Sequence, residues 1–450
     1  MRDYGYLERR GRGMGTPRKI MAAMKVCNGT EPVVRSGKET FTIVFQRQQR
    51  WTWRTISPWC DLLGVVPAGF RPRSVELEMV KMNPPAMIDR PPPTSASSLA
   101  DFDPVTLAQQ FADWGYKPSH AARVLRAFYE GSGRGNPAAA GLPAGLVERL
   151  RTGFAPGAAT LAARQVAADG TTKLLLRLGD GRTVESVLLP DFRADRAAGC
   201  LSSQVGCAMG CDFCATTKTG FERNLTAGEI VEQFLALRRE AHAVGRRLQT
   251  IVFMGMGEPL LNLDAVLAAV RRMADNSLGA LGWRQITVST VGIVPGIDAL
   301  TATGLNLHLA VSLHAPDDAT RARLLPMGKR FAIADILAAA DRFQASRGRP
   351  VTIQYCLLAG VNDSPEHARL LADVLGSRRM HINLLRYNPT GLSLRGITYE
   401  RSSDETADAF AAVLRGRGLV AHFRRSRGPD IDAACGQLRR RTEGGAGESG

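Results

Sequence analysis

The sequence predicts an α/β protein in which six strand–helix units build a parallel sheet, preceded by a small helical module and a β-hairpin. Three observations support this. After Cys200, short apolar runs alternate with amphipathic helical segments. Before it, two apolar runs flank a glycine-containing turn, and between residues 99 and 155 apolar residues recur every three or four positions. Parallel sheets bind ligands at the C-terminal ends of their strands, so we expect the functional residues there.

Composition narrows the class of protein. The 450-residue chain is 44% apolar, which is typical of a globular protein with roughly two to three domains. Its apolar runs are far shorter than the ~20 residues that cross a bilayer, and no signal peptide is evident. Eight scattered cysteines do not form a disulfide framework, so we expect a cytoplasmic protein with no membrane partner. The net charge of +16 fits either a nucleic-acid partner or a solubilising surface.

The first part of the chain lacks the pattern of a folded domain. Residues 1–98 hold 16 Lys and Arg against 8 Asp and Glu, and they end in the linker-like stretch "RPPPTSASS". We expect them to form a poorly structured basic extension. From Leu99 the pattern becomes helical, and three segments, 103–116, 119–131 and 142–154, make up an expected helical accessory domain of residues 99–155.

A hairpin extension, residues 156–199, is expected next, because "TKLLLRL" and "RTVESVLL" flank the turn "GDG". The six expected strands that follow are "CLSSQV", "TIVFMG", "QITVST", "LHLAVSL", "VTIQYCLL" and "HINLLRY". Between the first two, Thr226 and Glu229 form a capping box that predicts a helix start. These units occupy residues 200–424, and a basic C-terminal segment, residues 425–450, completes the chain.

A cysteine motif follows the first of these strands. Cys207, Cys211 and Cys214 have the spacing CxxxCxxC, and three thiolates in one loop can converge on a soft metal centre. A structural zinc site requires four ligands, and no Cys or His supplies the fourth at a standard spacing. A 4Fe–4S cluster with three protein ligands would leave one iron open, and the position of the loop after a strand favours this interpretation.

These residues resemble the radical S-adenosylmethionine (SAM) superfamily, and more closely the RlmN/Cfr-type RNA adenosine methyltransferases, with RlmN the nearer branch. The segments that carry the resemblance are "SSQVGCAMGCDFCAT", "GFERNLTAGEI", "FMGMGEPLLN", "STVGIVPGI", "SLHAPDD", "LLAGVNDS", "INLLRYNP" and "GPDIDAACGQL". They span residues 99 to about 442. The resemblance implies a radical SAM partial (β/α)6 barrel and two cofactors, SAM and a 4Fe–4S cluster held by the three cysteines of the motif.

The resemblance also assigns the SAM-binding residues. They are Gly257, Glu258, Ser289, Ser312, Leu313, His314 and Asn388. Several follow expected strands directly, and the acid in "GMGEP" can accept a hydrogen bond from a charged amine. Taken alone, each of these residues would more commonly form part of a turn.

Three further residues are implied to be catalytic. Glu185 would remove a proton from adenine, although an acid in an alternating strand is commonly just its solvent-facing residue. Burial would raise its pKa, which suits a proton acceptor. Cys435 would carry the methyl group, and Cys200 would release the protein–RNA adduct and leave a disulfide bond. On its residues alone, Cys435 would be interpreted as an inert buried thiol, and Cys356 as strand core.

The activity implied is methylation of carbon 2 of an adenosine in 23S rRNA and of the adenosine that follows the anticodon in tRNA. The methyl group would pass from SAM to Cys435, and a radical from a second SAM would activate it, because carbon 2 is too electron-poor for polar attack. We expect a monomer that takes electrons from a donor such as flavodoxin. Two alternatives stay open: methylation of carbon 8, since Arg386 and Tyr387 replace a Pro-Trp pair common in the family, and a non-catalytic RNA-binding protein of ribosome assembly.

Overall fold

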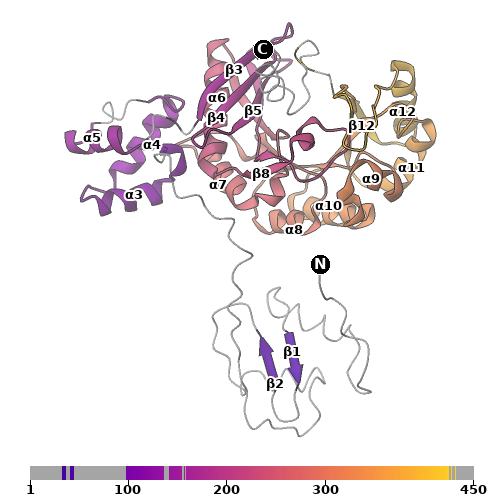
Figure 1. The fold of residues 1–450 in the computed structure, drawn as a ribbon, viewed down its shortest axis with the longest axis horizontal. Helices are drawn as coiled ribbons and strands as arrows, with labels where there is room; N and C mark the ends of the chain where they lie inside the picture. The colour runs from indigo at the N-terminus through magenta and orange to yellow at the C-terminus, as the bar shows by residue number, and fades with distance from the viewer. Residues whose placement is uncertain are drawn as a thin grey trace, which may run out of the picture. The chain divides into compact units, whose positions relative to one another are not determined.

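The computed structural model describes residues 33–36, 41–44, 98–135, 141–154, 157, 159–424, 427 and 431. The chain divides into two compact units, Met1–Pro91 and Pro92–Gly450. In the first unit, β1 (Val33–Ser36) and β2 (Phe41–Val44) pair antiparallel, a hairpin that the sequence analysis did not predict (Figure 1). The rest of the expected extension up to Ser97 lies outside the described residues.

The second unit begins with the helical module that the apolar spacing predicts. Its elements are η1 (Leu99–Asp101), α3 (Pro104–Asp113), α4 (His120–Glu130) and α5 (Ala144–Gly153). The side chain of Asp103 caps α3 by accepting from the amides of Val105 and Thr106. Leu107 and Phe111 of α3 are fully buried in the core, so one face of this short helix carries its packing.

A single ten-stranded sheet forms the centre of this unit, in the order β14-β13-β12-β11-β10-β9-β6-β5-β4-β3. The strands are β3 (Ala159–Val166), β4 (Thr172–Leu178), β5 (Thr183–Pro190), β6 (Arg196–Cys200), β9 (Arg247–Phe253), β10 (Ile286–Thr290), β11 (His308–Ser312), β12 (Thr352–Leu357), β13 (His381–Arg386) and β14 (Val420–Phe423). From β6 to β14 neighbouring strands run parallel, and from β3 to β6 they run antiparallel.

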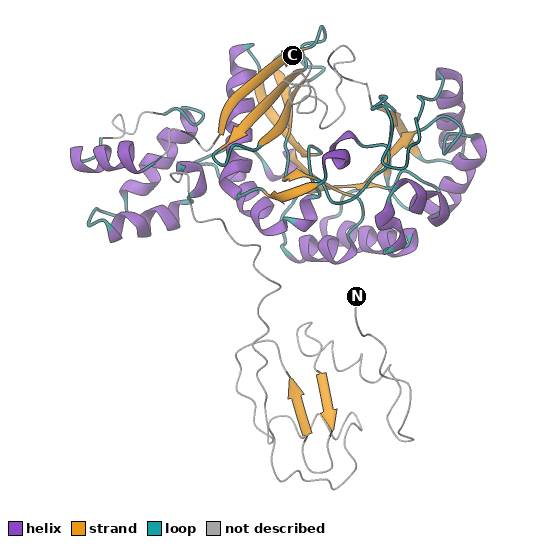
Figure 2. Ribbon diagram, in the orientation of Figure 1, coloured by secondary structure: helices purple, strands orange, loops and turns teal. Residues whose placement is uncertain are grey.

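Helices pack along the outer face of the curved sheet (Figure 2). They are α6 (Ala227–Ala243), α7 (Leu263–Ala274), α8 (Val294–Ala302), α9 (Asp318–Leu324), α10 (Ile333–Arg347), α11 (Pro365–Leu375) and α12 (Asp404–Gly416). The predicted capping box starts α6, since Thr226 and Glu229 exchange side-chain-to-backbone hydrogen bonds of 3.1 and 2.9 Å. In the part of the chain that the structure describes, no helix is long and apolar enough to cross a membrane.

The six predicted strand–helix units correspond to β6 and β9 to β13, and the predicted α/β fold is confirmed. Two strands of the ten-stranded sheet were missed: β14 adds a seventh parallel strand, and β3 adds a third antiparallel one. The hairpin is continuous with the parallel sheet, because β5 pairs with β6 and places Val187 opposite Cys200. Residues of the hairpin therefore share a face with residues of the barrel.

The predicted first strand, "CLSSQV", is wrong in its extent. β6 ends at Cys200, and β7 (Gln204–Gly206) pairs instead with β8 (Phe221–Asn224) in a separate two-stranded sheet. The physical reason is Ser202, whose hydroxyl donates to the Glu185 carbonyl at 2.7 Å and accepts from the Met256 amide at 2.9 Å. These bonds draw the chain out of the sheet.

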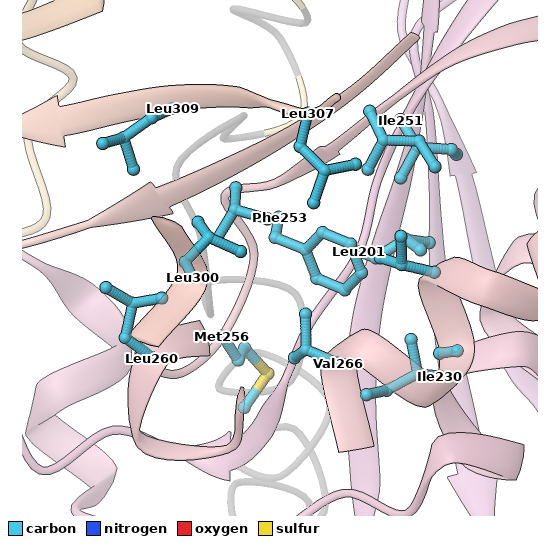
Figure 3. Packing of buried hydrophobic residues seen from close by; sticks show 14 of the residues in the cluster. Leu201, Ile230, Ile251, Phe253, Met256, Leu260, Val266, Leu300, Leu307 and Leu309 are labelled. Atoms are coloured by element: carbon cyan, nitrogen blue, oxygen red, sulfur yellow. The ribbon is translucent and has the colours of Figure 1, made fainter. Parts of the chain in front are cut away.

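The core beneath the sheet is closely packed around Phe253, the last residue of β9. Its side chain is 1% exposed, and Figure 3 shows its ring among Leu201, Leu300 and Val266. All three neighbours belong to the same apolar cluster. This packing fixes the position of the C-terminal end of β9, which leads into the glycine-rich turn.

We expect Phe253→Ala to lower the free energy of unfolding by about 3–5 kcal/mol, because the surrounding side chains cannot collapse fully into the space of a ring. Urea unfolding of the anaerobic protein measures this. Phe192→Ala is the matched control: Phe192 is 88% exposed, so its loss should change stability by no more than about 0.5 kcal/mol. Equal effects of the two substitutions would contradict the packing described above.

Candidate active site

A cavity of about 370 Å³ lies at the C-terminal ends of the parallel strands, where the sequence analysis expected the site. Ten of the predicted site residues line it: Cys200, Cys207, Cys211, Cys214, Gly257, Glu258, Ser289, Ser312, His314 and Asn388. They come from segments far apart in the sequence, and the fold brings them around one space. Leu313 and Glu185 are not among the lining residues.

The cysteine loop, residues 207–214, is held in place by its own hydrogen bonds. The Asp212 amide donates to the carbonyl of Leu324 at 2.9 Å, and the Asp212 carboxylate accepts from the Tyr399 hydroxyl at 2.6 Å. Thr217 donates to the carbonyl of Cys211 at 3.0 Å. Hydrogen bonds to the surrounding protein therefore position the loop.

The three thiols of this loop fit an iron–sulfur cluster. Burial raises the pKa of Cys207 to about 12 and that of Cys211 well above its usual value, and the nearby thiols add to both shifts. A bound metal centre would supply the missing positive charge. No three Cys, His, Asp or Glu side chains among the described residues are grouped closely enough to hold one metal ion. Zinc would gather its thiolates around a single centre at about 2.3 Å, whereas a cluster binds each thiolate to a different iron.

Glu258 is a buried carboxylate at the cavity wall, 2% exposed. It accepts from the amide of Val291 at 2.8 Å and from that of Leu260 at 3.1 Å. Burial raises its pKa to about 7 despite these bonds, which lower it. A carboxylate in this position favours a ligand with a positive charge, such as the amine of an amino acid.

The glycines of "GMGEP" are required by contacts within the chain. Gly257 has φ of +97°, and a Cβ there would lie 2.5 Å from the Cβ of Gln204. A Cβ on Gly255 would lie 2.7 Å from the carbonyl of Leu201. The nearest atoms to these glycines belong to the segment after β6, so the two glycines let the turn pack against that segment. The side-chain oxygen of Gln204 also accepts from the Glu258 amide at 2.8 Å.

His314 follows β11 in a left-handed conformation, with φ of 56°, and lines the cavity. Its Nδ1 accepts from the amide of Cys356 at 3.0 Å, and its carbonyl accepts from Asn362 at 2.8 Å. Burial, with the nearby Arg321 cation, lowers the pKa of His314 to about 3, so the ring is neutral. The side chain of Leu313 is fully buried, and its amide donates to the carbonyl of Gln354 at 3.1 Å.

Glu185 and Cys200 lie on the hairpin side of the cavity. Glu185 is 3% exposed, so it is not the solvent-facing residue of its strand. It shares a face of β5 with Val187 and Leu189, which line the cavity. Burial raises the pKa of Cys200 to about 11, and the Arg424 cation opposes this shift while Glu185 adds to it. Cys435, the third predicted catalytic residue, lies outside the described residues.

Several residues that line the cavity were not predicted to be site residues. Gln354 interrupts an apolar strand, and its buried side-chain oxygen has no hydrogen-bond partner among the described residues. Arg386 was noted only as a departure from the family, and it pairs with Asp404. Arg424 and Arg427 also line the cavity. A polar residue inside an apolar strand is the signal that could have revealed Gln354.

Comparison with known proteins places this site in a family. The model of the "Radical SAM superfamily" matches residues 201–372. "Probable dual-specificity RNA methyltransferase RlmN 1" of Opitutus terrae is 76% identical over 342 residues, which are 76% of this chain and 96% of that protein. A "Probable dual-specificity RNA methyltransferase RlmN" of Rhodopirellula baltica is 45% identical over 336 residues, 74% of this chain and 88% of the relative.

A solved structure agrees with these relatives. The crystal structure of a radical SAM methyltransferase from Sphaerobacter thermophilus shares 41% identity and a TM-score of 0.72. The match covers 76% of this chain and 98% of that one. Members of the superfamily use a 4Fe–4S cluster and SAM, the cofactors that the cysteine loop and the cavity fit. The chain therefore belongs to the RlmN family of radical SAM RNA methyltransferases.

Proposed function

We propose that this enzyme methylates carbon 2 of an adenosine in 23S rRNA and of the adenosine that follows the anticodon in tRNA. One observation carries the proposal: Cys200, which lies outside the cysteine motif, lines the same cavity as the three motif cysteines. A radical SAM enzyme needs only the motif to bind its cluster. Of the two further thiols at the cavity, Cys200 and Cys356, Cys200 is the one on the strand paired with β5, which carries Glu185. The printed names of the similar proteins, dual-specificity RNA methyltransferases, support an RNA substrate.

In this proposal the cavity holds both cofactors. Cys207, Cys211 and Cys214 would bind the cluster through three of its irons. The predicted SAM-binding residues would surround SAM at the strand ends, with Leu313 contributing through its backbone. The two groups together supply the one-electron chemistry that makes a methyl group reactive toward an electron-poor ring carbon. The carboxylate of Glu258 would hold the SAM amine, a role supported by its burial and by its need for a cationic partner.

The chain's own catalytic residues complete the proposal. Glu185 would remove the ring proton, a role supported by its burial and by its place on the face of β5 whose residues Val187 and Leu189 line the cavity. Cys435 would carry the methyl group, and the thiolate of Cys200 would then attack its sulfur and release the RNA. The Nζ of Lys173 donates to the carbonyl of Ile431 at 3.2 Å, which supports a place for the C-terminal segment beside the hairpin.

We propose that two basic parts of the chain recognise RNA: the helical accessory domain and the C-terminal segment. The helical accessory domain, residues 99–155, exposes basic side chains that suit a phosphate backbone: Lys117, Arg123, Arg126, Arg149 and Arg151. The C-terminal segment, residues 425–450, is also basic, and we propose that residues 1–98 are an extension that the catalytic fold does not require. We propose a cytoplasmic monomer that is reduced by a flavodoxin-type donor, since its substrates are the RNAs of translation.

Anaerobically reconstituted protein should bind about four irons per chain, and Cys211→Ala should bind far fewer, because loss of one thiolate opens the cage. Iron analysis and the visible spectrum measure this. Cys356→Ala is the control: Cys356 is a buried thiol that lines the same cavity but stands outside the motif, so its loss should leave the iron content unchanged. A colourless wild-type protein loaded with zinc would contradict the cluster assignment.

Mass spectrometry of RNA from a strain that lacks the enzyme tests the substrate. We expect 2-methyladenosine to disappear from both 23S rRNA and tRNA, and to return when the gene is restored. Complementation with Glu185→Gln is the control, because an amide cannot take up the ring proton, and methylation should not return. Loss of 8-methyladenosine instead would assign the enzyme to carbon 8, and unchanged RNA would overturn the proposal.

Substitutions of the two catalytic cysteines should fail at different steps. Cys435→Ala should never acquire a methyl group and should form no RNA-linked protein. Cys200→Ala should start the reaction and then stall, because no thiolate is present to attack the sulfur of the adduct. A nuclease-sensitive shift of the protein on a denaturing gel reports the trapped adduct. Normal turnover of Cys200→Ala would show that this chain does not use the proposed route.

A further inference from the structure

Arg321, in α9, is a fully buried cation with unmet hydrogen-bonding capacity. Its Nη2 donates to the carbonyl of Val291. Its Nε and Nη1 have no hydrogen-bond partner in the described part of the chain, and no ion pair within 4.0 Å joins it there to a carboxylate. Asp318 is the nearest acid that attracts it, and the side chain of Asp318 is exposed. An uncompensated buried charge costs several kcal/mol, so a further group has to balance it.

Arg272 is a buried arginine with a structural role, and hydrogen bonds to backbone carbonyls satisfy its guanidinium group. It is also buried, at 9% exposed, and its two terminal nitrogens donate to the carbonyls of Ala100 and Asp101 at 2.8 and 3.0 Å. Those bonds tie α7 to the helical module. Arg321 has no comparable set of acceptors, although it is more deeply buried.

Contacts around Arg321 place it behind the cysteine loop. One turn further along the chain, the carbonyl of Leu324 accepts from Asp212 of that loop at 2.9 Å. A Cβ on Gly210 would lie 3.4 Å from Pro326, just after α9. The Arg321 cation lowers the pKa of Cys211 and also that of His314, so it acts on both groups. Burial lowers the pKa of Arg321 itself to about 10, which leaves it charged at neutral pH.

We infer that Arg321 is a positioning residue for the iron–sulfur cluster, to which it supplies a buried positive charge from behind the cysteine loop. The cluster and its three thiolates carry a net negative charge that grows when an electron is added. Hydrogen bonds to sulfur and the local charge set the reduction potential of such centres. Arg321 therefore favours the reduced cluster, the state that the radical reaction requires.

The same arginine is poorly placed to bind SAM or RNA. It does not line the cavity, so it acts through its charge and not by contact with a bound molecule, whereas Val291, to which it is bonded, does line the cavity. The Val291 amide donates to Glu258 while its carbonyl accepts from Arg321. One peptide group thus links the cation beside the cysteine loop to the carboxylate at the cavity wall.

A redox titration of the reconstituted protein, followed by electron paramagnetic resonance without SAM or RNA, tests the inference. Arg321→Met keeps the length of the side chain but removes its charge and donors. We expect it to bind iron and to weaken one-electron reduction at least tenfold, a shift of about 59 mV to more negative potential. Arg321→Lys keeps the charge but loses the fork of donors, so its shift should be smaller and in the same direction. Arg323→Met, an exposed arginine of the same helix, should leave the potential unchanged.

Unfolding of the cluster-free protein separates this role from a structural one. Removal of an unpaired buried charge should leave the thermal midpoint of apo Arg321→Met equal to or above that of the wild type. An unchanged potential in Arg321→Met would overturn the inference, as would an equal shift in Arg323→Met. If Arg321→Met binds no iron, Arg321→Gln, which also removes the charge, takes its place, and an unchanged potential in that variant would overturn the inference. The inference rests on the proposed cluster ligands. That assignment is tested independently, because it is wrong if wild-type protein takes up no iron.

Discussion

The site depends on the point at which the chain leaves the sheet after Cys200. Ser202 bonds there to the carbonyl of Glu185 and to the amide of Met256, and the side-chain oxygen of Gln233 accepts from the backbone amide of Ser202 at 2.8 Å. This small polar network is buried, so each of its bonds is protected from competing water. It joins the hairpin, the glycine-rich turn and α6, and it determines where the cysteine loop begins. A change in any of its groups would displace several parts of the site together.

Continuity of the sheet explains how a carboxylate on the hairpin becomes part of the barrel's chemistry. Because β5 pairs with β6, the face that carries Glu185 and Val187 continues directly into the face that carries Cys200. The same pairing buries Glu185, which a free hairpin would leave in water. The antiparallel extension therefore forms one wall of the cavity. Burial and the charge of Glu185 on this extension raise the pKa of Cys200, which lies where β5 pairs with β6.

Much of the barrel could be predicted from the sequence, because parallel strands buried on both faces read as short apolar runs. β14 escaped prediction since its four residues, "VAHF", are half exposed, and β3 since most of its residues face solvent. The cysteine loop could be found because spacing alone carries its chemistry. Arg321 could not, since in "TRARLL" nothing separates it from the exposed Arg323. Only the packing of α9 on the cysteine loop distinguishes the two.

The ten-stranded sheet is open at its two edges. β3 and β14 occupy its two edges, and in the described part of the chain they do not pair with each other. A closed eight-stranded barrel would have a narrow interior filled by side chains, reached only along its axis. An open sheet can instead admit a bulky partner from the side. A structured polynucleotide could dock, present one unstacked base and depart again without any free end being threaded through the protein.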